Sequence, residues 1–473
     1  MHFSIPDTQE SKDENGTTYT CFNVHINGVF HCSVRYRQFH HFHEQLKKEF
    51  GSSILPPFPP KKLLALNSSQ LEERRVMLER YIQIISQDAT VCSSDTFNGF
   101  LLNAQQETAQ EDPEAVSLDV FLMNGHKISV NILSTDQTED VLENVASHIE
   151  LADDFVYYFG LYLVKKEDGG DNSIVRKLQE FESPYISLRA ANKEDSHRIV
   201  LRKSYWDPAF DDDLLEDRIA MNLLYVQAVS DIERQWTFAT KDQLKQLTAL
   251  QVKGSKREYL RFARTLKYYG FIQFRPCLTD YPEHNSRLLL SAGNKELNFR
   301  IQISSDQVKE GSFRITRMRC WRITTAGPEN GDSDKRQSNS LSKLEIAFEY
   351  LVAKDTLKWI TVQSDQAILI SMCLQSMVDE LIMKKQGKRI KRPQDRVKGS
   401  KYSYLKKNAS SHQTDSSKQS VSGESDDHSA ITKAVDSMKK ISDKLSNVSM
   451  KRGANETGIT ENDAFEGIGD DDL

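Results

Sequence analysis

The sequence predicts an α+β protein built from several domains and ending in a long polar tail. Its 473 residues exceed one domain, since domains usually hold about 150 residues. Segments with alternating apolar residues recur between segments with helical spacing, which indicates both strands and helices. From residue 387 onward the chain becomes polar, charged and rich in serine, a composition typical of disorder.

Composition limits the classes of function. The chain is 38% hydrophobic and 27% charged with a net charge of -6, so a nucleic-acid-binding surface is not expected and any basic site must be local. The 6 cysteines form no Cys-x-x-Cys pair, which argues against zinc or redox motifs and favours a reducing compartment. The first residues lack a signal-peptide pattern, and no stretch approaches the ~20 apolar residues of a membrane span. We therefore expect no metal or cofactor, and only peripheral membrane contact.

Residues 1–110 predict a first domain of strands, a helix, a proline-rich loop and further helices. Alternating residues on either side of Asn27-Gly28 predict a β-hairpin. Apolar residues then recur three to four apart, as on a buried helix face: Phe39, Phe42, Leu46 and Phe50. The proline loop occupies residues 56–60, and residues 71–86 and 91–106 are predicted as helices.

Cationic residues surround this proline loop. They are Arg35 before Tyr36, Lys61 and Lys62 after the last proline, and Arg74 and Arg75 on the next predicted helix. Guanidinium forks and a lysine charge suit a phosphorylated head group. One such cation is usually a solvated surface charge, but the spaced set favours a binding pocket.

These elements and motifs resemble the phox-homology (PX) domain of the sorting nexins, whose pocket takes phosphatidylinositol 3-phosphate. The resemblance implies that Arg35 holds the 3-phosphate and that Tyr36 stacks on the inositol ring. It further implies that Lys61 meets the 1-phosphate, with Lys62 as an alternative, and that Arg74 holds the ring hydroxyls. The acidic residue usual in the family shortly after the Tyr is replaced here by Gln38.

Three other features of this domain have two interpretations each. The leucines at positions 63, 64 and 66 either pack in the core, the commoner fate, or enter a lipid interface. The Pro-x-x-Pro loop has the form of an SH3 ligand, but it lies inside a predicted domain. His40, His41 and His43 lack the i, i+4 spacing of a zinc site, so we expect surface histidines.

Two lobes are predicted over residues 115–270, after an acidic linker. Alternation at 116–122 and 127–132 around Asn124-Gly125, followed by a helix, is how a ubiquitin-like fold begins. Residues 155–164 and 199–201 can supply its further strands. Residues 206–270 have helical spacing, with Trp206 and Trp236 as expected core anchors. This pair of lobes resembles the first two lobes of a FERM domain.

Residues 271–386 predict a third lobe of strands closed by one long helix at 365–385. The predicted strands are 271–274, 288–291, 297–303, 313–323, 344–352 and 357–362. This plan resembles the PH or phosphotyrosine-binding lobe of a FERM domain, where an extended peptide adds to a strand edge beside the helix. We nominate residues 313–322 as the strand that receives it.

PX and FERM-like lobes together resemble one small branch of the sorting nexins. That resemblance implies binding of Asn-Pro-x-Tyr or Asn-x-x-Tyr signals in receptor tails of the lipoprotein-receptor, integrin and P-selectin types. Trp321 on the strand and Val378 and Ile382 on the helix would line the groove, although pattern alone favours ordinary core positions. It also implies a peripheral protein of the cytoplasmic face of early and recycling endosomes, and leaves open a Ras-type small GTPase as a further partner.

The tail at 387–473 is expected to be largely disordered and to end in a docking peptide. A basic run at 384–407 is either solvated or attracted to anionic lipid. The resemblance implies that the C-terminal end, with Phe465, Ile468 and Leu473, engages the retriever complex. Asn462 and Phe465 also have the Asn-x-x-aromatic form of the receptor signal, so we expect that the tail can occupy its own groove.

The sequence has no Walker loop, no Gly-x-Ser-x-Gly and no kinase motif set, so we expect no enzyme. The favoured interpretation is an endosomal cargo adaptor that detects a lipid and a receptor tail together. The alternative is a FERM-type linker or scaffold between membrane and cytoskeleton. Localisation separates the two, since the first belongs on endosomes and the second at the cell cortex.

Overall fold

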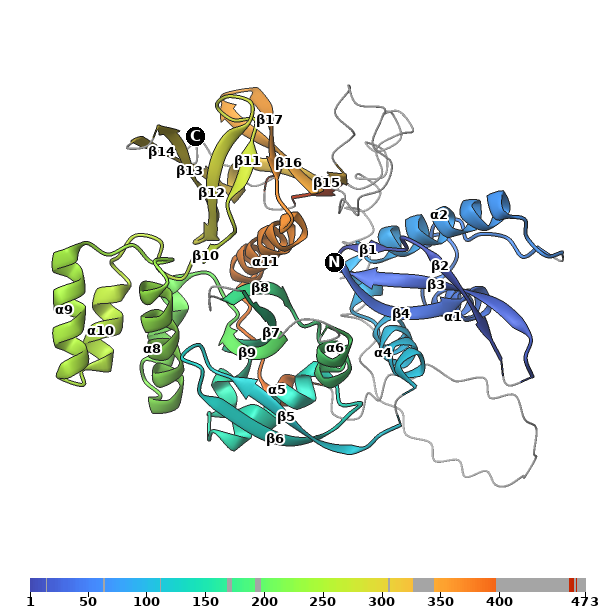
Figure 1. Ribbon diagram of the computed structural model, residues 1–473, viewed down its shortest axis with the longest axis horizontal. Coiled ribbons are helices and arrows are strands. Elements are labelled where there is room, and N and C mark those ends of the chain that lie inside the picture. The colour runs from blue at the N-terminus through green and yellow to red at the C-terminus, as the bar shows by residue number, and fades with distance from the viewer. Residues whose placement is uncertain are drawn as a thin grey trace, which may run out of the picture. The chain divides into compact units, whose positions relative to one another are not determined.

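The computed structural model describes residues 1–13, 15–62, 64–110, 112–167, 172–191, 197–304, 307–325, 344–396, 459–462 and 465 (Figure 1). These residues all fall within one compact unit. None of their helices is both long and apolar enough to cross a membrane. They form four successive lobes, coloured from blue to orange along the chain in Figure 1.

The first lobe is a four-stranded sheet packed against helices. Its hairpin turns at Asn27 and Gly28, whose positive φ angles of 51° and 80° suit a tight turn. Phe42 stacks on Phe100 with ring centroids 4.1 Å apart, so the two helices that carry these residues share one core. The elements are β1 (Phe3–Ser4), β2 (Thr8–Lys12), β3 (Thr18–Ile26), β4 (Val29–Arg35), α1 (Tyr36–Phe50), α2 (Ser68–Ile85), α3 (Ala89–Cys92) and α4 (Asp95–Ala109).

The second lobe is a five-stranded sheet in the order β6-β5-β9-β7-β8, which confirms a ubiquitin-like plan. A 3-10 helix occupies Asp153–Tyr158, so the strand predicted at 155–164 begins only at Phe159. Its elements are β5 (Ala115–Phe121), β6 (Lys127–Leu133), α5 (Thr138–His148), η1 (Asp153–Tyr158), β7 (Phe159–Lys166), β8 (Asn172–Lys177), α6 (Pro184–Ala191) and β9 (His197–Lys203).

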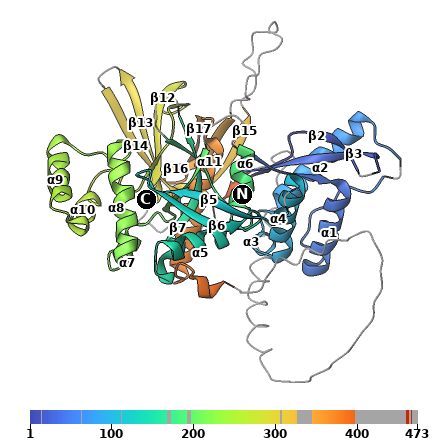
Figure 2. The same ribbon diagram turned by 60° about the horizontal axis from the view of Figure 1, so that its bottom comes forward.

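The third lobe is helical, as the spacing predicts. In Figures 1 and 2 its three longer helices lie side by side. Trp236 is buried, whereas Trp206 is only partly buried and packs against the core of the next lobe. The elements are η2 (Pro208–Phe210), α7 (Asp211–Leu214), α8 (Arg218–Glu233), α9 (Lys241–Val252) and α10 (Lys256–Ala263).

The fourth lobe is a sheet of eight strands, joined at its edge by a ninth from the tail, β18 (Ile459–Glu461), with one long helix, α11 (Ala367–Lys385). The strand predicted at 313–323 is wrong as a single element. A 3-10 turn, η3 (Ile315–Arg317), divides it between two strands that lie far apart in the sheet order. The strands are β10 (Ile272–Gln273), β11 (Cys277–Thr279), β12 (Ser286–Gly293), β13 (Glu296–Ser304), β14 (Gln307–Arg314), β15 (Met318–Thr325), β16 (Leu344–Ala353) and β17 (Thr356–Gln363).

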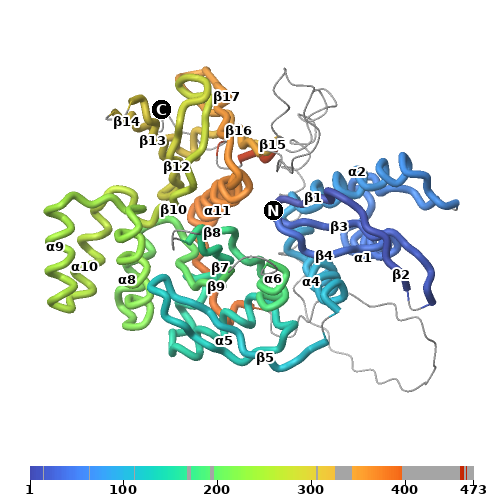
Figure 3. The backbone as a smooth tube through the Cα atoms, in the orientation of Figure 1, coloured from blue at the N-terminus to red at the C-terminus, as the bar shows by residue number. Residues whose placement is uncertain are grey.

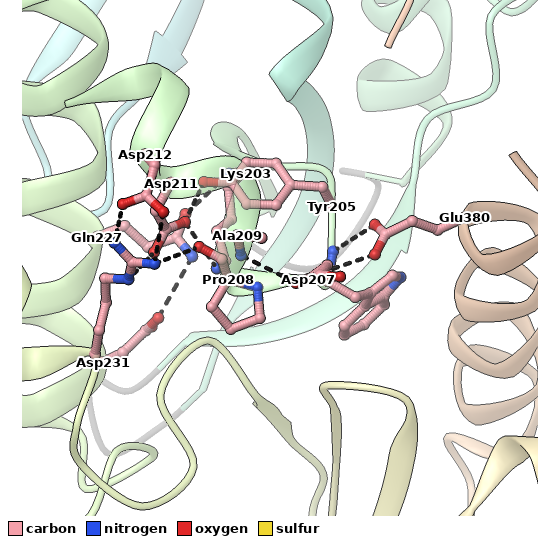
Figure 4. Close-up of polar contacts among 12 residues, drawn as sticks. Lys203, Tyr205, Asp207, Pro208, Ala209, Asp211, Asp212, Gln227, Asp231 and Glu380 are labelled. Carbon is pink, nitrogen blue, oxygen red and sulfur yellow. Dashed lines mark hydrogen bonds and ion pairs between the residues drawn. The ribbon is translucent and has the colours of Figure 1, made fainter. Parts of the chain in front are cut away.

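Helix α11 also fastens the last lobe to the linker between the second and third lobes. Figure 4 shows Glu380 of α11 directed at the segment that carries Asp207. Its carboxylate accepts the backbone N–H groups of Trp206 (2.7 Å) and Asp207 (2.8 Å). Burial raises the pKa of Asp207, but the ammonium groups of Lys384 and Lys295 outweigh it and lower that pKa to about 2. This charged junction keeps α11 at a fixed place beside the linker.

The basic segment after α11 folds back onto the second lobe as far as the structure describes it. Lys391 pairs with Glu139 and lies 2.9 Å from Glu180, and Arg396 lies 2.7 Å from Asp140. Lys391 and Arg396 are therefore paired with carboxylates of this lobe, whereas Lys385, Lys388 and Arg389 of the same run are exposed. Residues 397–407 of the basic run, and the serine-rich segment after it, lie outside the described residues.

Candidate lipid pocket and peptide groove

Arg35 and Tyr36 stand where β4 ends and α1 begins. Gln38 secures this junction, because its side-chain oxygen accepts the backbone N–H of Arg35 at 2.8 Å. The guanidinium of Arg35 lies over the ring of Tyr19, 3.5 Å from its centroid. Tyr19 holds the guanidinium flat by a cation–π contact, and spacing within the sequence gave no signal for it. The Gln in place of the family's acidic residue thus has a structural role of its own.

Tyr36 and Arg74 meet at the proline loop. The Tyr36 hydroxyl donates to the carbonyl of Pro59 at 2.7 Å, and the Arg74 guanidinium donates to Pro60 at 3.3 Å. Arg74 lies 4.0 Å from the centroid of the Tyr36 ring. Burial raises the pKa of Tyr36 against the opposing charge of Arg74, so the phenol stays neutral and keeps its proton to donate.

Phe58, inside the proline loop, packs against His43 and Tyr81. It stacks on His43 with ring centroids 4.6 Å apart and meets the edge of Tyr81 at 5.0 Å. His43 Nδ1 in turn lies 2.8 Å from the Tyr81 hydroxyl. His43 therefore packs against the loop and is half-buried. Across the described ranges, no group of three His, Cys, Asp or Glu side chains is arranged to hold a metal ion.

The cations around the loop divide into paired and unpaired ones. Lys62 lies 3.6 Å from Glu73, and Arg75 pairs with Glu72. By contrast, Arg35, Lys61 and Arg74 have no carboxylate within ion-pair distance among the residues that the structure describes. The structure thus brings Tyr36 and Arg74 to the proline loop, with Arg35 directly before Tyr36 and Lys61 exposed after the last proline, and the three cations have no counter-charge among the described residues.

Leu64 and Leu66, which follow the lysines, differ in their exposure to solvent. Leu64 is 85% exposed, so it is not part of the core, whereas Leu66 is half-buried. Leu63 lies outside the described residues. Ile54, on the segment that precedes the prolines, is 54% exposed. An exposed apolar side chain therefore stands on each side of the proline loop.

A segment of the tail lies on the edge of the fourth lobe. Strand β18 (Ile459–Glu461), red in Figure 3, pairs antiparallel with β15. Trp321 faces Thr460 in this register. The added strand completes the sheet in the way that an extended peptide does in β-augmentation. The tail therefore pairs with the C-terminal half of the strand nominated from sequence, the half that belongs to β15.

Asn462 ends this added strand inside a pocket of main-chain carbonyls. Its side-chain amide donates to Ile315 and to Met318, each at 2.7 Å, and its side chain is only 3% exposed. Ile315 begins the η3 turn and Met318 follows it as the first residue of β15, so the turn brings the two carbonyls to the same side chain. Phe465 N–H donates back to the Asn462 carbonyl at 2.9 Å, which closes a turn. A strand followed by an Asn-x-x-Phe turn therefore fills this edge.

The predicted groove residues are placed differently from one another. The backbone of Trp321 lies beneath the tail strand, but its indole is buried and donates to Ser371 on α11 at 2.9 Å. Val378 is buried in the core of the lobe, and Ile382 packs partly against it. The side chains of Trp321 and Val378 thus occupy core positions, and the backbone of Trp321 pairs with the tail strand. Phe465 is described, whereas Ile468 and Leu473 lie outside the described residues.

Comparisons with known protein families match each lobe. Residues 22–104 match the PX domain. Residues 116–206 match the F1 lobe of the sorting nexin 17/27/31 FERM domain, and residues 207–267 match the F2 lobe of the sorting nexin 17/31 FERM domain. Residues 270–382 match the sorting nexin 17 FERM C-terminal domain.

Whole-chain relatives agree with these matches. The chain is 49% identical to sorting nexin-17 of Danio rerio and 48% identical to that of Homo sapiens, in each case over 100% of both chains. It is 39% identical to sorting nexin-31 of Homo sapiens over 81% of this chain and 86% of that one.

A PX domain joined to F1, F2 and C-terminal FERM lobes defines a peripheral membrane protein of the endosomal sorting class, built from non-catalytic binding modules. The chain belongs to the PX–FERM sorting nexins, in the family of sorting nexin-17. It is therefore an endosomal sorting adaptor.

Proposed function

We propose that this adaptor binds phosphatidylinositol 3-phosphate through its PX lobe and Asn-Pro-x-Tyr or Asn-x-x-Tyr signals through its last lobe. The receptors are transmembrane proteins whose cytoplasmic tails carry such signals. The C-terminus then couples the captured receptor to the retriever complex, which directs it back to the cell surface and away from degradation.

The lipid proposal draws support from charge. Arg74 contacts the proline loop, Lys61 follows its last proline and Arg35 precedes Tyr36, and none of the three has a counter-charge in the described part of the chain. Such cations gain most from a multiply charged phosphate ligand. The ring of Tyr36 lies against the guanidinium of Arg74. Leu64 and Ile54 can enter the lipid interface beside the pocket, which would orient it toward the head groups.

The peptide proposal rests on the tail strand, the single observation that carries it. An Asn-x-x-Phe segment adds to β15 and buries its asparagine amide on the carbonyls of Ile315 and Met318. A receptor signal with Asn and an aromatic residue at the same spacing can make the same main-chain and amide bonds. This edge therefore suits that class of peptide.

The tail and a receptor signal would compete for one edge, and Phe465 gives the competition a consequence. It belongs both to the turn that closes on Asn462 and to the end proposed to engage retriever. A receptor tail that displaces β18 would free Phe465 from this turn. By linkage, cargo binding and retriever binding would then favour each other.

Lipid and cargo sites act together on one membrane. Once the PX lobe holds a head group, a receptor tail in the same bilayer is at high effective concentration, so the combined affinity exceeds that of either site. Recognition of both signals confines the adaptor to membranes that carry both.

Liposome co-sedimentation tests this function with the full chain. Vesicles carry phosphatidylinositol 3-phosphate, with or without an anchored Asn-Pro-x-Tyr peptide. Arg35→Ala should weaken lipid binding more than about tenfold, since hydrogen bonds between charged groups contribute ~1.5–3 kcal/mol. Arg37→Ala is the matched control, because Arg37 is an exposed arginine two residues away.

The anchored peptide should strengthen binding of wild type, and of Arg37→Ala equally. Wild type that sediments no better with the lipid than without it would contradict the lipid proposal. A peptide that fails to recruit the chain, even when the lipid does, would contradict the proposed groove.

A further inference from the structure

The indole of Trp321 is held by one hydroxyl. Its Nε1–H donates to Ser371 Oγ at 2.9 Å, and both side chains are almost completely buried. The backbone of the same tryptophan forms the register pair with Thr460 of the tail strand. Ser371 therefore fixes, from the α11 side, the residue at the centre of the edge where a peptide strand adds.

Ser371 has a second partner, and it comes from the PX lobe. His2 Nε2 lies 2.7 Å from Ser371 Oγ, although 369 positions separate the two residues. Because an indole only donates, Ser371 accepts from Trp321 and its own hydroxyl is free to donate to His2. Burial lowers the pKa of His2 to about 4, so the imidazole is neutral and its Nε2 can accept. The three side chains form a continuous chain of hydrogen bonds.

His2 is itself fixed within the PX lobe. Its backbone N–H donates to Asn27 Oδ1 at 2.9 Å, and its carbonyl accepts the Asn27 N–H at 2.8 Å. The next residue, Gly28, lies directly against α11, since a Cβ there would come within 2.9 Å of Ile368 Cδ1. The hairpin turn and His2 thus contact α11 together.

The segment that begins with His2 runs along α2, the helix that carries Arg74. Gln83 Nε2 donates to the carbonyl of Phe3 at 3.0 Å, and the backbone N–H of Ile5 donates to Glu79 at 2.7 Å. Arg75, next to Arg74, donates to the carbonyl of Ile5. A shift of α2 toward a head group would therefore move residues 2–5 with it.

We propose that His2 and Ser371 are positioning residues for the peptide groove, through which occupancy of the lipid pocket favours the β15 geometry that accepts a peptide strand. The proposal rests on the proposed function of both sites. Such coupling is reciprocal and is independent of the membrane, because it acts inside one chain. It is thus separable from the gain that two ligands on one bilayer produce.

Titration calorimetry in solution isolates this coupling. The ligands are water-soluble dibutanoyl phosphatidylinositol 3-phosphate and an Asn-Pro-x-Tyr peptide, and the full chain carries Asn462→Ala. The tail strand binds the same edge as the peptide, so a change in the geometry of Trp321 would weaken binding of both and hide the effect on the peptide. Asn462→Ala is included to weaken this competition by the tail. We expect saturating lipid to tighten peptide binding about fivefold or more, the lower end of usual coupling, and the peptide to tighten lipid binding by the same factor.

A pair of His2 variants distinguishes positioning from mere packing. His2→Phe keeps a ring but loses the acceptor, and it should abolish the coupling while each ligand still binds alone. His2→Gln retains an acceptor that can reach Ser371 and should restore the coupling at least in part. Ser371→Ala should weaken peptide binding about fivefold and shift the indole N–H resonance of Trp321, because that N–H loses its acceptor. His284→Phe, at an exposed histidine, is the control.

The outcomes separate this proposal from the proposed function. If either ligand fails to bind the Asn462→Ala chain at all, the proposed function is wrong at that site. If both bind but lipid leaves peptide affinity unchanged, the coupling is overturned while the function stands. Equal coupling in the Asn462→Ala chain with and without His2→Phe would likewise remove His2 and Ser371 from any positioning role.

Discussion

The side-chain amide of Asn462 donates to the main-chain carbonyl of Ile315 at 2.7 Å, across 147 positions of sequence. The contact depends on η3, the turn that interrupts what the alternation predicted as one strand. In a continuous strand that carbonyl would accept a hydrogen bond from a neighbouring strand and would not be available to Asn462. The interruption thus creates an asparagine pocket at the end of an open sheet edge.

Asn462→Ala should release the tail from β15. The variant loses two hydrogen bonds to main-chain carbonyls, each of which contributes about 1 kcal/mol, so affinity for an Asn-Pro-x-Tyr peptide should rise by up to about 30-fold. Fluorescence anisotropy of a labelled peptide on the full chain measures it. Glu461→Gln, at an exposed position of the same strand, should change little. Deletion of residues 459–473 should raise affinity at least as much, and unchanged affinity in both would contradict competition by the tail.

Leu64→Glu should weaken binding to vesicles without affecting the head-group pocket. The side chain is 85% exposed, so the folded lobe does not need it, while a carboxylate at a lipid interface loses apolar insertion and repels anionic lipid. We expect about a tenfold loss on phosphatidylinositol 3-phosphate vesicles and no loss with the dibutanoyl lipid in calorimetry. A parallel loss in both assays would show that Leu64 supports the pocket instead.

The stability of the chain should fall as the pH drops from about 6.5 toward 4, partly through His31. Burial lowers the pKa of this histidine to about 4, although Glu182 and the Leu101 carbonyl oppose the shift. The unfolded chain then binds more protons than the folded one across this window, so acid favours unfolding by about 1 kcal/mol per pH unit. Below the folded pKa both states are protonated and the dependence ends.

His31→Gln tests that source of pH dependence, because glutamine can still donate to Leu101 but does not titrate. Urea unfolding between pH 7 and 4.5 should show a flatter profile for this variant than for wild type. His126→Gln, at an exposed histidine, should keep the wild-type slope. Identical slopes for all three chains would mean that His31 keeps an ordinary pKa.

Glu182→Ala should destabilise the chain by about 3 kcal/mol. The carboxylate is buried, pairs with Arg176, and also accepts the Ser187 hydroxyl at 2.6 Å and the Gln179 N–H at 2.6 Å. Its removal leaves a buried guanidinium without a counter-charge, which usually costs about 3–5 kcal/mol. Urea unfolding measures the loss.

The double variant Arg176→Met, Glu182→Leu should recover most of that stability, since it leaves no buried charge alone. Lys253→Ala provides a contrast, because its pair with Glu258 is exposed and should contribute less than about 1 kcal/mol. A Glu182→Ala chain as stable as wild type would mean that water reaches Arg176.

Much of the fold could be predicted from local patterns. The apolar spacing of Phe39, Phe42 and Leu46 predicted α1, and Asn27-Gly28 predicted the first hairpin. Short or polar strands such as β1, β2 and β11 escaped prediction, because too few residues alternate in them. The break at Ile315 escaped as well, since nothing in the local alternation marks a corner of the sheet.

The candidate sites divide in the same way. Arg35, Tyr36, Lys61 and Arg74 could be named because family motifs fix their spacing, and the structure shows Tyr36 and Arg74 in contact with each other and with the proline loop. Tyr19, His2 and Ser371 could not be named, since each meets its partner through tertiary packing alone. Similarly, the sequence could suggest that Asn462 seeks a groove, but not which carbonyls would receive it.

The sequence by itself determined the order of lobes, the cations around a stiff proline loop and the Asn-x-x-Phe motif of the tail, because these depend on residue type and short spacing. Only the tertiary structure decided which cations are paired, which strand forms the open edge and which helix links that edge to the PX lobe. Those properties depend on contacts between residues hundreds of positions apart, such as Ser371 with His2, and such contacts cannot be predicted from the spacing of neighbouring residues.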